Sequence, residues 1–592
     1  MVSRFLITTA DEQTWKFDLP VIFLGEWCCF YDRKHIWQSM DAIIAAPYGL
    51  GKKSKDVDHA EARALEEALF PILCEALNQY HGTLHDRRFW RIVLGHWFHR
   101  YVDVILNRVR TLELCLRTHQ LNGTTVFTDE CYALAPQDSY LAIRAFNDPR
   151  WNSVLYGRIL KLLGATTCPV EIISGDAFEG FRWPAAGPEF NLGQRIFKWG
   201  YLHARKLAGQ LARENDAFII NSFLPRKEEI KLQLALGQVP QLWASPKLAL
   251  TENPDRALRQ RLSAKIAGAA DDSLEGILRT MVFELLPVCY LEGFAGLAES
   301  VKQLPWPKKP KFIFTSNNFD MDEVFKLWTA IKVESGYKYI TGQHGNNYGT
   351  YRYMYPAVEE ETADRFLTWG WADGLPQHMP AFIFKTAGRK SEACNPDGGL
   401  VLIELHAGLM LSTWDAVAEF KAYFADQQSF VEKLQNLPKV RLTVRLHHGH
   451  ANLKWGEEGR WKEFDPTVKL DTGASDISKL IAQSRLIVHS YDSTGILETL
   501  SQNIPTLAFW QNDLEHLRES AKPYYQLLVD AGIVHFTPES AAAKVNEVWG
   551  DVEGWWAQSA VQEARKQFCE RYSRVSSCPV RELKKILLSD IS

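Results

Sequence analysis

The sequence predicts an α/β protein built from parallel sheets of the Rossmann type. Short apolar runs typical of strands alternate with segments of helical periodicity along the chain, which is the order that parallel sheets require. A stretch rich in Gly, Pro and polar residues divides the chain at 385–399, as a linker between domains would. At 592 residues the chain also exceeds what one hydrophobic core usually fills, so more than one domain is expected.

The first 395 residues are predicted to form an N-terminal domain with helical insertions. Its strands are predicted at 5–9, 21–25, 42–47, 217–223, 311–316 and 337–343. A helix is expected at 58–79, and helical periodicity continues to about residue 120. The longest apolar stretch, 277–298, carries Arg279 and Glu284, so we interpret it as one buried helix rather than a membrane span.

Residues 396–592 are predicted to form a complete doubly wound domain. Its strands are expected at 399–406, 440–448, 468–473, 485–491 and 506–510, and its helices at 414–434, 476–483 and 495–502. No internal repeat interrupts this alternation, which excludes solenoids and propellers.

The composition of the chain indicates which binding partners and which cellular compartment to expect. A formal net charge of -4 gives no general attraction to nucleic acid, so no nucleic-acid partner is predicted. The ten cysteines show no Cys-x-x-Cys pair, which favours reduced thiols. The N-terminus carries no long apolar signal segment. We therefore expect a cytoplasmic protein and leave peripheral attachment to the inner membrane open.

The sharpest motif is the strand-to-helix turn within 485–510. Small hydroxyl, acidic and glycine residues follow a buried strand here, namely Ser490, Asp492, Ser493, Thr494 and Gly495. Such a turn directs backbone N–H groups and hydroxyls at one point, and the helix N-terminus adds partial positive charge. The turn therefore predicts an anion site, with simple helix capping as the alternative.

A second candidate for anion binding follows the strand at 440–448. Arg445 and His447 stand at its carboxyl end, where a guanidinium can bind two oxygens of a phosphate or carboxylate. The neighbouring histidines lack an acidic partner at ligand spacing, so no metal ion is predicted; solvated loop histidines are the alternative.

Acid/base chemistry is predicted from residues 314–349. Asp320 and Asp322 follow one strand, and Gln343, His344 and Gly345 follow the next. If the two strands are adjacent and parallel, a carboxylate and an imidazole meet and can share acid/base or nucleophilic duty. We predict Asp320, Asp322 and His344 as catalytic and Gln343 and Gly345 as acceptor-side residues, with helix capping as the alternative for the aspartates.

Two further residues are candidates for acceptor binding. Glu26 lies beside an aromatic residue at a predicted strand end, and Arg91 lies in an aromatic-rich segment at 87–97. Packing and helix-surface roles are the alternative for both.

Several segments together resemble a family of large transferases from leptospiral and other bacterial O-antigen gene clusters. They are FLITTADEQTW, FLGEWC, RFWRIVLGHW, TGQHGNNYG and SYDSTGILETLSQNIPTLAFW. The chain more distantly resembles the GT-B β-Kdo transferases, which use a CMP-activated ulosonic acid. The resemblance implies a GT-B-like fold of two Rossmann-type domains, a donor phosphate on the 493–495 turn and a donor ribose on Glu498. It also implies a catalytic aspartate and histidine, which fall on Asp320 or Asp322 and on His344.

This resemblance predicts a glycosyltransferase that uses a nucleotide sugar, CMP-linked by analogy, without a separate cofactor. Its acceptor would be a glycan or lipid-linked glycan of the bacterial surface. Three alternatives remain: a CDP-alditol phosphotransferase that makes a teichoic-like polymer, a UDP-sugar epimerase and a non-catalytic assembly scaffold. The phosphotransferase would make a phosphodiester rather than a glycoside, the epimerase is normally much shorter, and the scaffold would bind no nucleotide.

Overall fold

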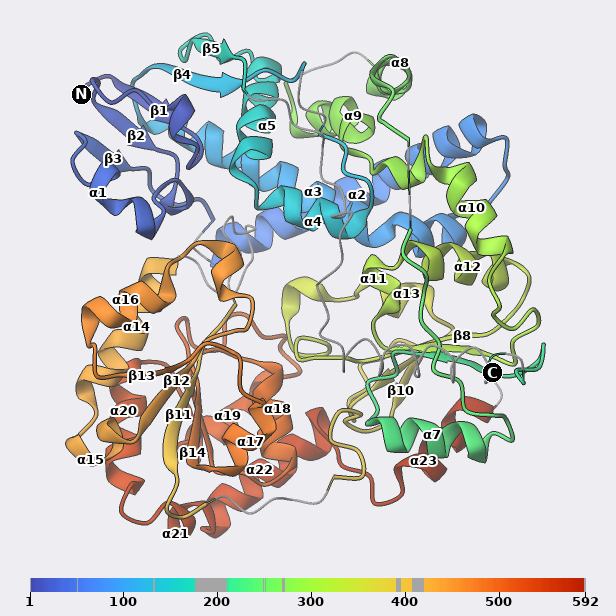
Figure 1. The fold of residues 1–592 in the computed structure, drawn as a ribbon, viewed down its shortest axis with the longest axis vertical. Helices are drawn as coiled ribbons and strands as arrows, with labels where there is room; N and C mark the ends of the chain where they lie inside the picture. Colours follow the sequence, from blue (N-terminus) through green and yellow to red (C-terminus); the bar gives the residue numbers. More distant parts are fainter. Residues whose placement is uncertain are drawn as a thin grey trace, which may run out of the picture.

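A computed structural model describes residues 2–49, 52–130, 134–175, 209, 211–248, 250, 252–268, 272–389, 395–406 and 420–589. Within them the chain forms three parallel β-sheets with helices packed around them (Figure 1). The α/β class and the Rossmann-type units predicted from the sequence are confirmed. The first 395 residues, predicted as one acceptor-side Rossmann-like domain with helical insertions, contain two of these sheets.

The first sheet has the strand order β3-β2-β1-β4-β5. Its strands are β1 (Arg4–Ile7), β2 (Val21–Phe23), β3 (Ala42–Ile44), β4 (Leu121–Phe127) and β5 (Val170–Ile173). The helices of this part are α1 (Lys34–Trp37), α2 (Lys52–His81), α3 (Arg87–Thr118), α4 (Ser139–Phe146) and α5 (Pro149–Leu162). The chain leaves β1 toward β2 and β3 and returns on the other side through β4, which is a doubly wound topology.

The second sheet has the order β10-β9-β8-β7-β6. Its strands are β6 (Phe218–Ile220), β7 (Ile313–Thr315), β8 (Tyr339–Gly342), β9 (Arg365–Thr368) and β10 (His378–Pro380). The helices of this stretch of the chain are α7 (Arg226–Ala235), α8 (Arg256–Ala267), α9 (Leu274–Leu285), α10 (Phe294–Lys302), α11 (Asn318–Met321), α12 (Glu323–Glu334) and α13 (Val358–Thr362). Of these, α8 contacts α2 and α9 contacts α3.

The third sheet has the order β13-β12-β11-β14-β15-β16. Its strands are β11 (Gly399–Ile403), β12 (Leu442–Arg445), β13 (Lys469–Asp471), β14 (Ser484–His489), β15 (Thr506–Phe509) and β16 (Val534–His535). Its helices are α14 (Phe420–Lys433), α15 (Asn436–Val440), α16 (Glu457–Phe464), α17 (Ile477–Ala482), α18 (Thr494–Ser501), α19 (Lys522–Asp530), α20 (Pro538–Val548), α21 (Val552–Trp556) and α22 (Ser559–Tyr572). The last helix, α23 (Pro579–Leu588), returns to the second sheet and packs on α7 (Figure 1).

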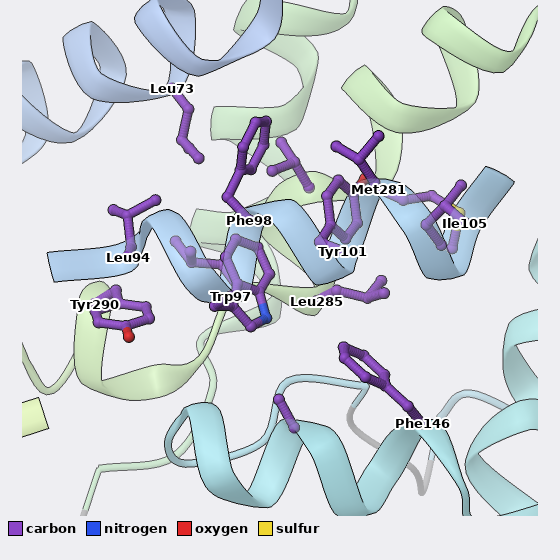
Figure 2. Close-up of a cluster of buried hydrophobic side chains, with 14 of the residues drawn as sticks. Leu73, Leu94, Trp97, Phe98, Tyr101, Ile105, Phe146, Met281, Leu285 and Tyr290 are labelled. Atoms are coloured by element: carbon purple, nitrogen blue, oxygen red, sulfur yellow. The ribbon is translucent and has the colours of Figure 1, made fainter. Parts of the chain in front are cut away.

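Helix α3 organises the core of the N-terminal half. Buried aromatic side chains along it pack against α2, α9 and the α4–α5 region, as Figure 2 shows for Trp97, Phe98 and Tyr101. Burying large apolar surfaces on several sides of one helix stabilises its position strongly. Because α3 also contacts α12 and α13, it holds the first and second sheets in one arrangement.

Most predicted strands lie within a few residues of their expected bounds. The structure differs from the prediction in some strands and in two helices. The prediction omitted β4, β5, β9, β10 and β16. The single helix expected at 277–298 is instead α9 and α10, separated by Pro287, whose ring and missing N–H end the helix. Part of the helix predicted at 414–434, residues 414–419, lies outside the described residues.

Candidate active site

One candidate site is a pocket of about 580 Å³ at the third sheet. It lies where β11, β12 and β14 end, and residues from α17 and α18 complete its wall. The chain winds outward from β11 in one direction and from β14 in the other, so this is the topological switch point of the sheet. Ligands of doubly wound sheets bind at the carboxyl ends of the strands at this point, and the volume suits a small-molecule ligand.

The predicted anion turn forms part of this pocket. Ser493 and Gly495 line it, and Ser493 caps α18 by accepting the N–H of Ile496. The N–H groups of Thr494 and Gly495 have no acceptor among the described residues. A Cβ on Gly495 would lie 2.5 Å from His489 Cε1, so only glycine brings the backbone this close to that ring. The turn therefore offers free amide donors at a helix N-terminus.

Three other residues of the predicted turn hold the loop together instead of lining the pocket. Ser490 donates to the carbonyl of Ile403 and contacts the hydroxyl of Tyr423. Asp492 pairs with His516 at 3.0 Å and accepts from Tyr525. These bonds occupy the polar atoms that the sequence had suggested for donor binding.

Thr494 is the third of these residues, and it marks where the second and third sheets meet. Its hydroxyl oxygen accepts the backbone N–H of Asn346 at 2.9 Å, while the Asn346 side chain donates to Asp492 at 2.8 Å. A Cβ on Gly345 would lie 3.0 Å from the same Thr494 oxygen. The loop after β8, which carries His344, therefore rests directly on the anion turn.

The positive charges of the pocket differ from those predicted. Arg445 lines the pocket, but its guanidinium donates to Asp471 at 2.7 Å and to the Ser475 carbonyl. Burial and the neighbouring histidines lower the pKa of His447 to about 4, so its ring is neutral near pH 7. Arg389 also lines the pocket, and its side chain has no hydrogen-bond or ion-pair partner among the described residues. Arg389 is the cation best available to a ligand.

Glu498 lies on the pocket wall and is linked to the second sheet. Lys385 pairs with its carboxylate at 3.1 Å and also lies over the ring of Phe223. Lys385 and Arg389 belong to the segment that the sequence presented as a linker. Only their placement beside α18 identifies them as site residues.

Two buried groups set the charge inside the pocket. Burial raises the pKa of Glu404 to about 8, so this carboxyl is mostly protonated at pH 7. Burial lowers the pKa of His489 to about 3, so this ring is neutral. Neither group adds charge near pH 7, and an anionic ligand meets no free carboxylate from Glu404.

The two strands that carry the predicted acid/base residues are adjacent, which is the arrangement that brings the segments after them together. β7 and β8 are parallel neighbours, with Thr315 opposite Thr341. Asp320 and His344 consequently come within electrostatic reach, and Phe319 contacts the His344 ring at 5.8 Å between centroids.

The two aspartates have different roles in the structure. Both carboxylate oxygens of Asp320 accept from Arg100, at 2.6 and 2.8 Å, and although burial opposes it, this ion pair lowers the pKa of Asp320. Asp322 caps α12 by accepting the N–H of Phe325 at 3.0 Å. The capping alternative therefore describes Asp322, and Asp320 is a weak base.

The four residues predicted for the acceptor side make the following contacts in the structure. Gln343 is 1% exposed. Its side-chain NH₂ group donates to the carbonyl of Gly345, and its side-chain oxygen accepts from Trp369 N–H and Trp371 Nε1. Arg91 is 7% exposed and paired with Glu66 and Glu361.

Glu26 lies between the first and third sheets and accepts the backbone N–H of Lys421 at 3.0 Å. Of the four acceptor-side residues, only Gly345 lies against the pocket turn, through its approach to Thr494.

Neither a metal-binding cluster nor a membrane-spanning helix occurs within the described parts of the chain. No group of three or more His, Cys, Asp and Glu side chains is arranged there to hold a metal ion. No helix among the described residues has the length and apolar character needed to cross a bilayer.

A family model for LIC12162 family transferases matches residues 4–587 of the sequence. The chain belongs to this family. It is therefore a transferase, as predicted, and the pocket at the third sheet is its candidate active site. No curated protein matches the sequence.

Solved structures show only weak likeness to this transferase. A variant of the wall teichoic acid polymerase TagF matches with 11% identity and a TM-score of 0.32, over 68% of this chain and 98% of that one. The spinosyn rhamnosyltransferase SpnG complexed with thymidine diphosphate matches with 11% identity and a TM-score of 0.32, over 63% and 99%. Acinetobacter baumannii MurG matches with 12% identity and a TM-score of 0.27, over 50% and 76%. These likenesses are too weak to assign an activity.

Proposed function

We propose that this transferase moves a sugar from a nucleotide-activated donor to a glycan or lipid-linked glycan acceptor of the bacterial surface. A CMP-linked ulosonic acid such as Kdo is the first donor to test. The observation that carries the proposal is the pocket at the switch point of the third sheet, with its anion turn in contact with the loop that carries His344. This contact supports a donor phosphate and a base at one reaction centre.

The donor phosphate would rest on the free N–H group of Gly495 at the start of α18, with Arg389 beside it. Fixed amide dipoles and a guanidinium stabilise the charge that develops on a leaving nucleotide phosphate. Glu498, held by Lys385, would accept the ribose hydroxyls. The neutral state of Glu404 favours this anion, because an ionised carboxylate in the same pocket would repel it.

His344 would act as the base for the acceptor. In the transfer step its ring nitrogen takes the proton of the acceptor hydroxyl, the hydroxyl oxygen bonds to the anomeric carbon, and the bond from that carbon to the donor phosphate breaks. Asp320 suits this role less well, because Arg100 occupies both of its carboxylate oxygens. Its negative charge instead helps to stabilise a protonated His344.

Calorimetric titration with CMP, CDP, UDP and GDP tests the donor site. We expect CMP to bind selectively, and Arg389→Gln to weaken binding by about 10- to 100-fold, the loss of one charge-assisted contact. Arg581→Gln is the matched control, since Arg581 is an exposed arginine of α23 that does not line the pocket.

Selective binding of UDP or GDP would refute the CMP-linked donor, and no binding to the folded protein would refute the donor site itself. With a CMP-linked sugar as donor, the product is expected to contain a glycosidic bond. A phosphodiester product from a CDP-alditol would favour the phosphotransferase alternative.

A further inference from the structure

A continuous hydrogen-bonded chain leads from the helical core to His344. His96 on α3 contacts Glu359 on α13 at 2.9 Å between Nε2 and Oε2. The other oxygen of Glu359 contacts the hydroxyl of Tyr348, and that hydroxyl lies 3.0 Å from His344 Nδ1. Glu359 and Tyr348 are 4% exposed each, so water does not compete for these bonds.

The proton positions in this chain follow from the charge of Glu359. Burial by itself would raise the pKa of Glu359, but the hydrogen bonds from His96 and Tyr348 bring it below its ordinary value. A carboxylate only accepts hydrogen bonds, so the Tyr348 hydroxyl donates to Glu359. Burial raises the pKa of Tyr348, so its hydroxyl keeps the proton near pH 7.

The Tyr348 oxygen is then left as an acceptor for His344. His344 must supply the proton at Nδ1, and a neutral imidazole protonated at Nδ1 carries its lone pair on Nε2. Burial lowers the pKa of His344, against the opposing charges of Glu359 and Asp320, so the neutral ring is the resting form. Lys385 and His96 are the cationic and titratable groups that favour this neutral form.

The His344 ring is connected to the wall of the donor pocket through Phe223 and Lys385. Nε2 has no hydrogen-bond partner among the described residues. The His344 ring contacts Phe223 at 5.9 Å between centroids, and Lys385 spans from the Phe223 ring to Glu498 on the pocket wall. The backbone two residues after His344 is held by Thr494 of the anion turn.

We propose that Tyr348 and Glu359 are positioning residues that hold His344 in its Nδ1–H tautomer and so leave Nε2 as the base for the acceptor hydroxyl. His96 anchors the far oxygen of Glu359 and ties this tautomer to α3. The inference rests on the proposed function for the role of His344, but the tautomer itself is a property of the protein without substrate.

Nitrogen-15 NMR of histidine-labelled protein tests the tautomer directly. The His344 signals are identified as those that disappear in His344→Gln. We expect His344 to carry its proton on Nδ1 in the wild-type protein near pH 7. A proton on Nε2 would overturn the proposal.

Glu359→Gln gives a sharper test, because it keeps the hydrogen bonds and reverses the direction of the two that involve the Tyr348 hydroxyl. The Gln oxygen can still accept from His96, so its NH₂ group faces Tyr348 and donates to the phenol oxygen. The Tyr348 hydroxyl must then donate to His344 Nδ1, and we expect His344 to change to the Nε2–H tautomer. A tautomer that does not change would overturn the proposal.

Tyr348→Phe removes the acceptor altogether, and Tyr80→Phe is a matched control at an exposed tyrosine. In transfer assays with saturating donor, we expect Glu359→Gln and Tyr348→Phe to lower kcat by about 10- to 100-fold with little change in donor KM. This is part of the roughly 10²- to 10⁴-fold contribution of a positioned base. Full kcat in a variant whose tautomer has changed would overturn the catalytic role.

The two proposals fail separately. Absence of nucleotide binding would refute the donor site while the tautomer measurement stays valid. A wrong tautomer in a protein that binds CMP and transfers sugar would refute the positioning role alone.

Discussion

The buried carboxyl of Glu404 makes the folding stability of the region around the third sheet fall as the pH rises. The substitution Glu404→Gln is expected to remove this dependence. Glu404 is 5% exposed, and its Oε1 accepts from Trp461 Nε1 at 2.9 Å. Burial raises its pKa from an ordinary value of 4.5 to about 8. The folded state therefore binds a proton between these values that the unfolded chain has already lost.

The sign and size follow from linkage. Where the folded state binds more protons, raising the pH destabilises it, by about 1.4 kcal/mol for each pH unit. Over the whole range between the two pKa values, the loss of folding stability reaches about 5 kcal/mol. From about pH 4.5 to pH 7 the loss is about 3 kcal/mol. Glu404→Gln removes the ionisation but keeps the acceptor for Trp461.

We expect the stability of Glu404→Gln relative to the wild type to rise by about 3 kcal/mol from about pH 4.5 to pH 7. Comparison at each pH cancels the opposite effect of His489 and His447, whose lowered pKa values favour the folded state as the pH rises toward 6.5. Hydrogen exchange of the β11 amides reports the local opening free energy. Glu432→Gln, at an exposed carboxylate of α14, is the control. A pH-independent difference for Glu404→Gln would refute the buried, protonated carboxyl.

Two further predictions concern the anion turn and the aspartate pair. Gly495→Ala places a Cβ 2.5 Å from His489 Cε1. We therefore expect the free energy of unfolding to fall by about 1–3 kcal/mol and nucleotide binding to weaken. An unchanged Tm in thermal unfolding would contradict the close approach. Asp322→Ala removes the cap of α12 and should cost about 1 kcal/mol, whereas Asp322→Asn can still cap and should stay near wild-type stability. A loss of activity in Asp322→Asn without loss of stability would instead restore a catalytic role for this residue.

Local patterns in the sequence predicted the elements whose environment is uniform. β14 and α18 lie almost where the apolar run and the hydroxyl-rich turn placed them. The strand β4 was missed because Leu121–Phe127 carries a glycine and two threonines, and only its place between β1 and β5 buries them. Residues 277–298 were correctly predicted as buried, but Pro287 divides them.

The sequence by itself determined the α/β class and the turn at Ser493–Gly495, because these depend on periodicity and turn chemistry over a few residues. Only the tertiary structure decided which groups remain available to a ligand. It pairs Asp320 with Arg100, 220 residues away, and Glu359 with His96, 263 residues away. It also places Arg389 of the predicted linker in the pocket. Charge pairing and desolvation act between residues that packing brings together, and no local pattern carries that information.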